Sequence, residues 1–273
     1  MKLLFTDLDG TLLNNESLVS ADTKAFLDEF LAAGNKLILS SGRPTDSVLE
    51  VKEHAGLHQS GILLSCYNGA QIYDCDSRRT IMAKKLPLSY VSYLQKQAEK
   101  QQLHIQTYQE NAVVSPADDE EIRFYRTKIH VPLVVSPVLT DALTDGPYKM
   151  LAADLYDHNR LEAFRLAISD WAQGKIQTIY SNDRYLELFR QDAGKGNALR
   201  FVCGHFGVAL SDAYAAGDAE NDISMLQAAG TGIAMCNAPD QVKQAADIVT
   251  QYDNDKDGLA ETMRSLLSGQ TSI

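Results

Sequence analysis

The amino-terminal part of the chain alternates between short apolar runs and amphipathic segments. The runs "KLLFTDL", "NKLILSSGRP" and "GILLSCYNGA" suit buried strands, because they are short and largely apolar. Between the first two lies "SADTKAFLDEFLAAG", whose apolar residues recur at helical spacing and which ends at Gly34. Pro44 suits the first turn of a second helix. Strands that alternate with helices predict a parallel sheet with right-handed crossovers.

The pattern changes at about Met82. The polar amphipathic segment "LPLSYVSYLQKQAEKQQL" predicts a helix, and four later segments predict strands: "HIQTYQE", "YKMLAADL", "KIQTIYS" and "RYLELFR". After the predicted helix "DAGKGNALRFVCGHFG" the strand–helix alternation resumes. We therefore expect an α/β fold in which residues 1–85 and 189–273 form a parallel-sheet core and residues 86–188 form an inserted α/β unit.

Composition narrows the class of protein. The 273 residues are 45% hydrophobic and 22% charged, which is typical of a globular protein with a real core. The net charge of −11 and the lack of a basic block argue against nucleic acid as the main partner, but not against a small anionic substrate. The four cysteines form no CxxC pair and predict free thiols. No membrane span or signal peptide is expected, so we predict a cytoplasmic protein.

Two acidic residues stand at the end of the first predicted strand. In the β conformation Asp7 and Asp9 would point to the same side, just beyond the strand, before Gly10 turns the chain. Ligands of open parallel sheets bind in the crevice beyond these strand ends. Mg²⁺ would compensate the repulsion between the two carboxylates, although a solvated turn would also explain the pattern.

A second acidic group follows a predicted strand in "AAGDAENDISML", residues 215–226. Asp218, Asn221 and Asp222 would open a helix there, and one of them could simply cap it. Three such residues exceed what one cap needs. Because the preceding strand belongs to the same predicted sheet, these side chains and Asp7 would share one crevice, which favours a metal site.

Two further segments suit the binding of phosphate. "LILSSGR" ends a predicted strand with Ser41, Gly42 and Arg43, where a hydroxyl and backbone N–H groups could approach a phosphate at a helix start. Lys195 lies between glycines at another helix start, where a cation is unfavourable for the helix dipole unless it has an anionic partner. An ordinary turn and a surface lysine are the alternatives.

The four segments "DLDGT", "SSGR", "GKGNAL" and "GDAENDISML", in this order and spacing, resemble the motifs of the haloacid dehalogenase-like (HAD) superfamily. An insert between the second and third motifs resembles the Cof-like sugar-phosphatase branch, as do "NGA" at 68–70 and "GIAMCNAPDQVKQAAD" at 232–247. The resemblance implies a Rossmann-like core with an inserted α/β cap. It departs only at Ser41, where Thr is commoner, and at Cys236, where Gly is commoner.

The resemblance also implies catalytic roles. Asp7 would be the nucleophile that forms an aspartyl-phosphate. Asp9 would protonate the leaving oxygen and then deprotonate the hydrolytic water. Mg²⁺ would be held by the Asp7 carboxylate, the Asp9 backbone carbonyl and Asp218, with Asp222 either a ligand or a support for one.

The same resemblance implies that Ser41, Gly42, Lys195 and Asn221 hold the phosphoryl oxygens. Arg43 would contact the substrate or form a structural ion pair, and we favour the ion pair. The cap would close over the core, exclude water and select the leaving group. Several of its polar residues could contact that group, although packing or surface roles would explain them equally: Tyr125, Arg126, Tyr180, Asn182 and Arg184.

Two other segments resemble known binding motifs but lack residues that those motifs require. "DNDKDG" at 253–258 resembles the start of a calcium loop, but the twelfth position is Arg264 instead of Glu, and we expect Asp257 to cap a helix. "GTGIAM" lacks the third glycine of a dinucleotide fingerprint.

We therefore predict a Mg²⁺-dependent phosphatase for small phosphorylated metabolites such as sugar phosphates. The alternatives are a phosphomutase, a non-enzymatic phospho-acceptor module and a partner-binding scaffold. The oligomeric state is left open.

Overall fold

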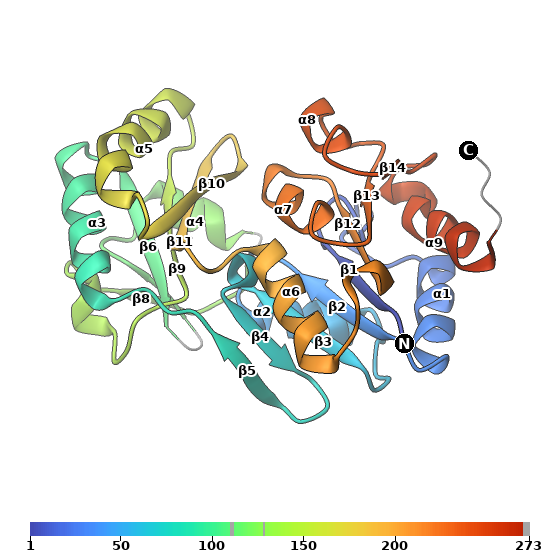
Figure 1. Ribbon diagram of the computed structural model, residues 1–273. Helices are drawn as coiled ribbons and strands as arrows, with labels where there is room; N and C mark the ends of the chain where they lie inside the picture. The colour runs from blue at the N-terminus through green and yellow to red at the C-terminus, as the bar shows by residue number, and fades with distance from the viewer. Residues whose placement is uncertain (110–111, 128, 270–273) are drawn as a thin grey trace.

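The computed structural model describes residues 1–109, 112–127 and 129–269, and it contains two β-sheets flanked by helices (Figure 1). The strands of the larger sheet follow the order β14-β13-β12-β1-β2-β3-β4-β5. Its parallel strands are β1 (Leu3–Thr6), β2 (Lys36–Ser40), β3 (Ile62–Cys66), β12 (Ala213–Gly217), β13 (Thr231–Ala234) and β14 (Ile248–Val249). The antiparallel strands β4 (Gln71–Asp74) and β5 (Arg79–Ala83) complete one edge. The predicted α/β fold with a parallel-sheet core is confirmed.

Helices cover both faces of this sheet. They are α1 (Ala21–Ala32), α2 (Thr45–His54), α6 (Lys195–Phe206), α7 (Ile223–Leu226), α8 (Asp240–Lys243) and α9 (Gly258–Ser268). Short 3₁₀ turns lie among them: η1 (Tyr67–Gly69), η3 (Leu210–Asp212), η4 (Glu220–Asp222) and η5 (Asn254–Lys256). In the part of the chain that the structure describes, no helix combines the length and the apolar character needed to cross a bilayer.

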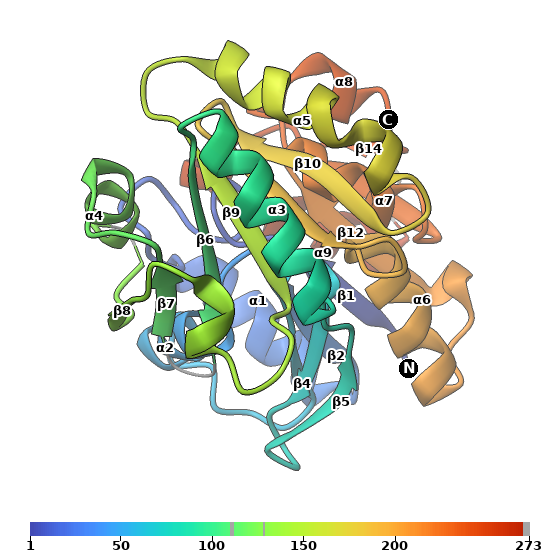
Figure 2. The same ribbon diagram turned by 90° about the vertical axis from the view of Figure 1, so that its left-hand side faces the viewer.

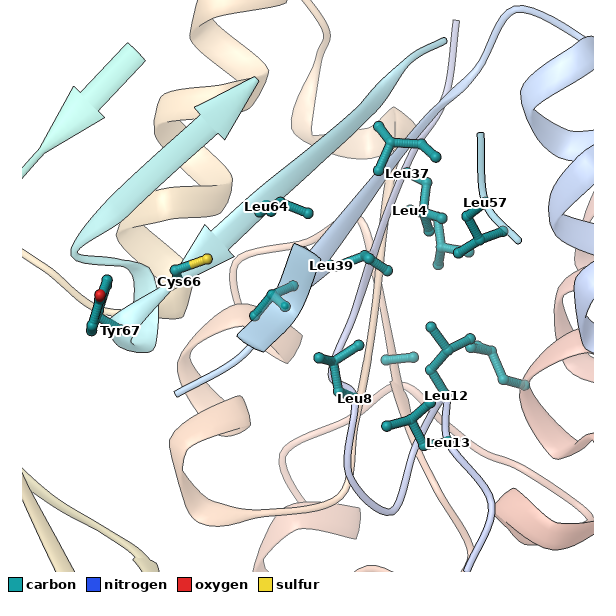
Figure 3. Close-up of a cluster of buried hydrophobic side chains, with 14 of the residues drawn as sticks. Leu4, Leu8, Leu12, Leu13, Leu37, Leu39, Leu57, Leu64, Cys66 and Tyr67 are labelled. Atoms are coloured by element: carbon teal, nitrogen blue, oxygen red, sulfur yellow. The ribbon is translucent and has the colours of Figure 1, made fainter. Parts of the chain in front are cut away.

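Successive side chains of the central strands point to opposite faces of the larger sheet and contribute to an apolar cluster on each face. Leu4, Leu37 and Leu39 belong to the cluster that packs against α1 and α9, and Figure 3 shows their side chains gathered on one face of the sheet. Their neighbours Leu3 and Phe5 belong to the other cluster, which packs against α6. Both faces of the central strands are buried, so these strands read as continuous apolar runs.

The second sheet has the order β10-β11-β9-β6-β7-β8. Its strands are β6 (His104–Gln109), β7 (Ala112–Ser115), β8 (Leu133–Val135), β9 (Lys149–Ala153), β10 (Ile176–Asn182) and β11 (Tyr185–Arg190). The helical elements of this part are α3 (Leu88–Lys100), α4 (Glu120–Arg126), η2 (Leu139–Ala142) and α5 (His158–Ala172). Figures 1 and 2 show α3 and α5 on the face of this sheet that points away from the larger sheet. The domain bounds 1–85 with 189–273, and 86–188, stay a prediction.

Two local expectations are wrong. The acidic segment after β12 forms the turn η4 and then the short helix α7, instead of one helix, because the loop folds around the Asp222 carboxylate, which accepts hydrogen bonds from the backbone N–H groups of Asp218 and Ala219 at 3.0 Å. Asp257 occupies the N-cap position of α9 without a capping hydrogen bond, and its carboxylate accepts from the hydroxyls of Ser20 and Thr23 instead. The four cysteines are free, as predicted.

Replacing glycine by alanine should have opposite effects on stability at two positions of α6. A Cβ at Gly196 would lie 2.2 Å from the backbone oxygen of Ser224, whereas a Cβ at Gly204 would meet no atom within 4 Å. We expect Gly196→Ala to destabilise the fold by about 1–3 kcal/mol through overpacking. Gly204→Ala should stabilise it by about 0.5–1 kcal/mol, because alanine favours the helix. Urea unfolding of both variants measures the difference, and equal midpoints would contradict this packing.

Candidate active site

The predicted catalytic side chains follow neighbouring strands, at the point where each strand ends. Asp7 follows β1, Ser41 follows β2 and Asp218 follows β12. Because β1 pairs in parallel with β12 on one side and with β2 on the other, these three residues meet at one edge of the sheet. Figure 1 shows the three strands in the larger sheet. This edge is the one at which open parallel sheets bind ligands.

Lys195 lies at the centre of this edge. As the first residue of α6 it is 1% exposed, and its Nζ lies 2.5 Å from Oδ1 of Asp7 and 2.5 Å from Oδ1 of Asp222. Burial alone would lower the pKa of Lys195, but the carboxylates of Asp222 and Asp7 more than offset burial and raise it. The lysine therefore stays protonated, and its anionic partners explain a cation at a helix N-terminus.

The carboxylates outnumber this ammonium. Burial raises the pKa of Asp7 well above its usual value; Lys195 opposes the shift, and Asp222, Asp218 and Asp9 add to it. Burial, with Asp222 next, also raises the pKa of Asp218 to about 6, although the Thr11 hydroxyl donates a hydrogen bond to its Oδ1 at 2.9 Å. The cluster therefore carries more negative charge than Lys195 alone can compensate.

Two glycines allow the loops to come this close. Gly10 has a φ of +81°, and a Cβ there would lie 2.4 Å from Oδ2 of Asp218. A Cβ at Gly217 would lie 2.4 Å from Cβ of Asp222. Any larger residue at Gly10 or Gly217 would push apart the loops that carry the acidic residues.

The acidic cluster fits a divalent cation. Asp7, Asp218 and Asp222 each offer a carboxylate oxygen, and these atoms all lie within 4.8 Å of one another. Hard oxygen ligands in a site with excess negative charge suit Mg²⁺. The Asp222 carboxylate is already engaged, since one oxygen accepts from Lys195 and the other from the two N–H groups of its own loop. This geometry favours Asp222 as the support of the Asp218 loop.

Asp9 points elsewhere. Its carboxylate lies outside the cluster and accepts hydrogen bonds from Arg43, at 2.9 Å from Nε and 2.5 Å from Nη2. The side chain of Asp9 is 57% exposed, whereas that of Arg43 is 16% exposed. Arg43 thus forms the ion pair that we favoured, and its partner is the carboxylate to which the resemblance gives acid–base chemistry.

Three of the expected phosphate-binding residues, Ser41, Gly42 and Asn221, lie next to the buried Asn68. Ser41 is buried, and its Oγ accepts from the backbone N–H of Arg43 at 3.1 Å. Asn221 donates through Nδ2 to Oδ1 of Asn68 at 3.0 Å, and a Cβ at Gly42 would lie 3.0 Å from that same Oδ1. Asn68 Nδ2 and Asn221 Oδ1 are buried without a partner among the described residues.

Sequence reasoning missed Asn68 as a site residue. Its φ of 55° is a left-handed conformation that asparagine tolerates better than most residues. An Asn-Gly pair directly after a predicted strand was therefore the signal that could have identified it.

A cavity of about 250 Å³ lies over Asp7, Ser41 and Asn221, and Asn68 does not line it. Its floor comes from the larger sheet: Asp7, Asp9, Ser41, Gly42, Arg43 and Asn221. Lys149 and Glu187 of the second sheet line its roof, and sequence reasoning missed both. Lys195, Asp218 and Asp222 do not line the cavity, so the charges that position Asp7 stand behind its floor.

Only some of the five residues that could contact the leaving group reach the cavity. Tyr125 and Asn182 line it. Tyr180 instead donates its hydroxyl to Glu162 at 2.9 Å, and the Arg184 guanidinium lies 5.1 Å from the ring centre of Phe124. Arg126 donates through Nε to a backbone oxygen, that of Val131, at 3.2 Å.

A larger cavity of about 680 Å³ lies between β4, β5 and β6 and is bordered by Tyr67, Tyr73, Tyr108 and Tyr148. None of the predicted catalytic residues lines it. The larger cavity is therefore not the candidate active site. The acidic residues that converge with Lys195 indicate the smaller cavity instead.

Comparisons with known proteins agree with this geometry. A crystal structure of a haloacid dehalogenase-like hydrolase from Bacteroides thetaiotaomicron superposes with a TM-score of 0.87 at 30% identity, covering 97% of this chain and 99% of that one. A structure from Thermotoga maritima gives a TM-score of 0.82 at 29% identity, covering 96% of each chain. The 5-amino-6-(5-phospho-D-ribitylamino)uracil phosphatase YwtE of Bacillus subtilis is 29% identical over 99% of both proteins.

The sequence itself matches a family model. The model of the haloacid dehalogenase-like hydrolases matches residues 4–263. The phosphatase names of the relatives confirm the predicted enzyme class, a phosphoric monoester hydrolase. Since the match includes all four motifs and extends over both sheets, the chain belongs to the haloacid dehalogenase-like hydrolase family.

Proposed function

We propose that the protein is a Mg²⁺-dependent phosphatase that hydrolyses small phosphorylated metabolites, with sugar phosphates the expected class, through a phosphorylated Asp7. The observation that carries this proposal is the buried ammonium of Lys195 between Asp7 and Asp222, with Asp218 beside them at the same sheet edge. Phosphoryl transfer requires mainly positioning and charge neutralisation, and this arrangement supplies both.

In the first step, an oxygen of Asp7 attacks phosphorus while the bond from phosphorus to the leaving oxygen breaks, and Asp9 gives its proton to that oxygen. In the second step, Asp9 takes a proton from water, the water oxygen attacks phosphorus, and the bond from phosphorus to Asp7 breaks. The ion pair with Arg43 fixes the direction of the Asp9 side chain in the present structure, and Asp9 must leave it or share it to reach the leaving oxygen.

The remaining residues bind the phosphoryl group. Lys195 holds Asp7 in place and opposes the rise in the pKa of Asp7, because its ammonium lies between two carboxylates. The buried Nδ2 of Asn68 has no partner among the described residues and is available as a donor. The Ser41 side chain lines the same cavity as Asp7. A bound Mg²⁺ would be held by Asp7, Asp218 and the Asp9 backbone carbonyl and would neutralise charge on the transferred group.

The size of the cavity supports a small substrate. A volume of about 250 Å³ suits a phosphate ester with a compact leaving group, and residues of both sheets line it. The Bacillus subtilis relative is named for a substrate with a phosphorylated ribityl chain, which supports a phosphorylated polyhydroxy compound as the class without identifying the substrate of this chain.

The direct test is phosphate release from p-nitrophenyl phosphate and from a panel of phosphorylated metabolites, with and without Mg²⁺. Release that requires Mg²⁺ supports the proposal. A product that retains the phosphate at a different position, with no phosphate released, would indicate a phosphomutase instead. A phosphorylated protein that persists without turnover would indicate a phospho-acceptor module.

Removal of the nucleophile should abolish hydrolysis. We expect Asp7→Asn to lower the rate of phosphate release by at least about 10³-fold, because an amide cannot form the acyl phosphate. The matched control is Asp240→Asn, the same change at an exposed position on α8. Equal activity of Asp7→Asn and the control would refute the mechanism.

Mg²⁺ should stabilise the folded protein, because it offsets the excess charge of the acidic cluster. At a concentration about 100-fold above its dissociation constant, we expect Mg²⁺ to raise the melting temperature by roughly 5–10 °C. Asp218→Asn should lose most of this shift, and Asp240→Asn should keep it. Differential scanning calorimetry with and without EDTA measures the effect. An unchanged melting temperature in the wild-type protein would count against a metal in this cluster.

A further inference from the structure

The second sheet has two chemically different faces. Met150 and Ala152 of β9 and Leu186 and Leu188 of β11 point into an apolar core that also contains Phe164 of α5. The alternate positions of the same strands point the other way, because successive side chains of a strand face opposite sides. Lys149, Leu151, Tyr185 and Glu187 occupy this second face and line the cavity above Asp7.

This face carries a buried ion pair directly over the site. Lys149 Nζ lies 2.6 Å from Oε2 of Glu187, and the two side chains are 2% and 5% exposed. The strands are antiparallel neighbours in which Lys149 stands opposite Phe189, so the pair crosses the ladder diagonally.

Stability does not require these charges. A buried ion pair gains little over apolar residues of similar volume, because both charges must leave water. Apolar residues already occupy neighbouring positions on this face, where Leu151 is 1% exposed and Phe189 is fully buried. A charged pair kept at such a position, in the roof of a cavity, points to a role toward the ligand.

The pair also has unused hydrogen-bonding capacity. An ammonium has three N–H donors. Among the described residues, Lys149 donates through its side chain only to Glu187, and its Nζ otherwise lies 5.2 Å from the ring centre of Tyr108. Glu187 accepts from Lys149 and, through Oε1, from the Ser181 hydroxyl at 3.1 Å, which leaves lone pairs on both oxygens.

We propose that Lys149 and Glu187 together recognise adjacent hydroxyl groups of the leaving group. A hydroxyl accepts from an ammonium and donates to a carboxylate, so the pair matches two neighbouring hydroxyls. Because the charges of the pair cancel, the roof offers no net attraction to a second anionic group. Monophosphates of neutral polyhydroxy compounds are therefore selected over bisphosphates and phosphorylated acids. This inference rests on the proposed function.

The test compares kcat/KM for sorbitol phosphate with kcat/KM for p-nitrophenyl phosphate, which has no hydroxyl groups. Glu187→Gln keeps the shape but weakens a charged hydrogen bond, and we expect the ratio to fall about 10- to 100-fold. Lys149→Met/Glu187→Leu removes both charges without leaving one unpaired, so it should fold and show at least the same fall.

A control separates recognition from loss of structure. Arg160→Met breaks another ion pair of this part of the chain, in which Arg160 Nη1 lies 2.5 Å from Oδ2 of the buried Asp154 and neither residue lines the cavity. Its ratio should stay within about twofold of the wild-type ratio. Phosphoglycerate and a sugar bisphosphate should be poorer substrates of the wild-type protein than sorbitol phosphate.

An unchanged ratio in the double variant, with p-nitrophenyl phosphate still hydrolysed, would overturn the inference alone. A wild-type protein that hydrolyses neither compound with Mg²⁺ present would overturn the proposed function and the inference with it.

Discussion

The ammonium of Lys195, 2.5 Å from a carboxylate oxygen of Asp7 and of Asp222, ties together three distant parts of the chain. Asp7 directly follows the first strand, Lys195 begins α6, and Asp222 ends the turn η4 after β12. A buried lysine is costly unless its charge is compensated, and here two carboxylates, one more than neutrality requires, contact one ammonium. The three groups therefore depend on one another, and the loops that carry them must close around this point.

The glycines and the sheet make that closure feasible. Parallel pairing of β12, β1 and β2 brings the ends of these strands to one edge. Gly10 and Gly217 then let the acidic loops approach at distances that a Cβ would prevent. The apolar clusters on both faces of the sheet hold the strands in place. The charged groups at the strand ends are therefore positioned by a packed core.

The second sheet contributes a different kind of surface. Its outer face is apolar and packs under α3 and α5, whereas its inner face carries charged and hydroxyl side chains over Asp7. The floor of the cavity therefore serves the phosphoryl group, and the roof meets whatever is attached to it. This division explains why the acidic motifs lie entirely outside the second sheet.

The sequence by itself determined the α/β fold, the parallel core and the set of acidic residues with Lys195. Short apolar runs, their alternation with helices, and polar residues directly after strands are local signals, and the burial of both sheet faces makes them strong. The segment that forms η4 was predicted as the start of a helix. It forms a turn because the Asp222 carboxylate accepts a hydrogen bond from the backbone N–H of Asp218, four residues earlier, and so competes with helix formation. Only the tertiary structure decided the partner of Arg43, the Asn68–Asn221 contact and the Lys149–Glu187 pair. Each joins residues that are far apart along the chain, so no local pattern encodes which side chains will meet.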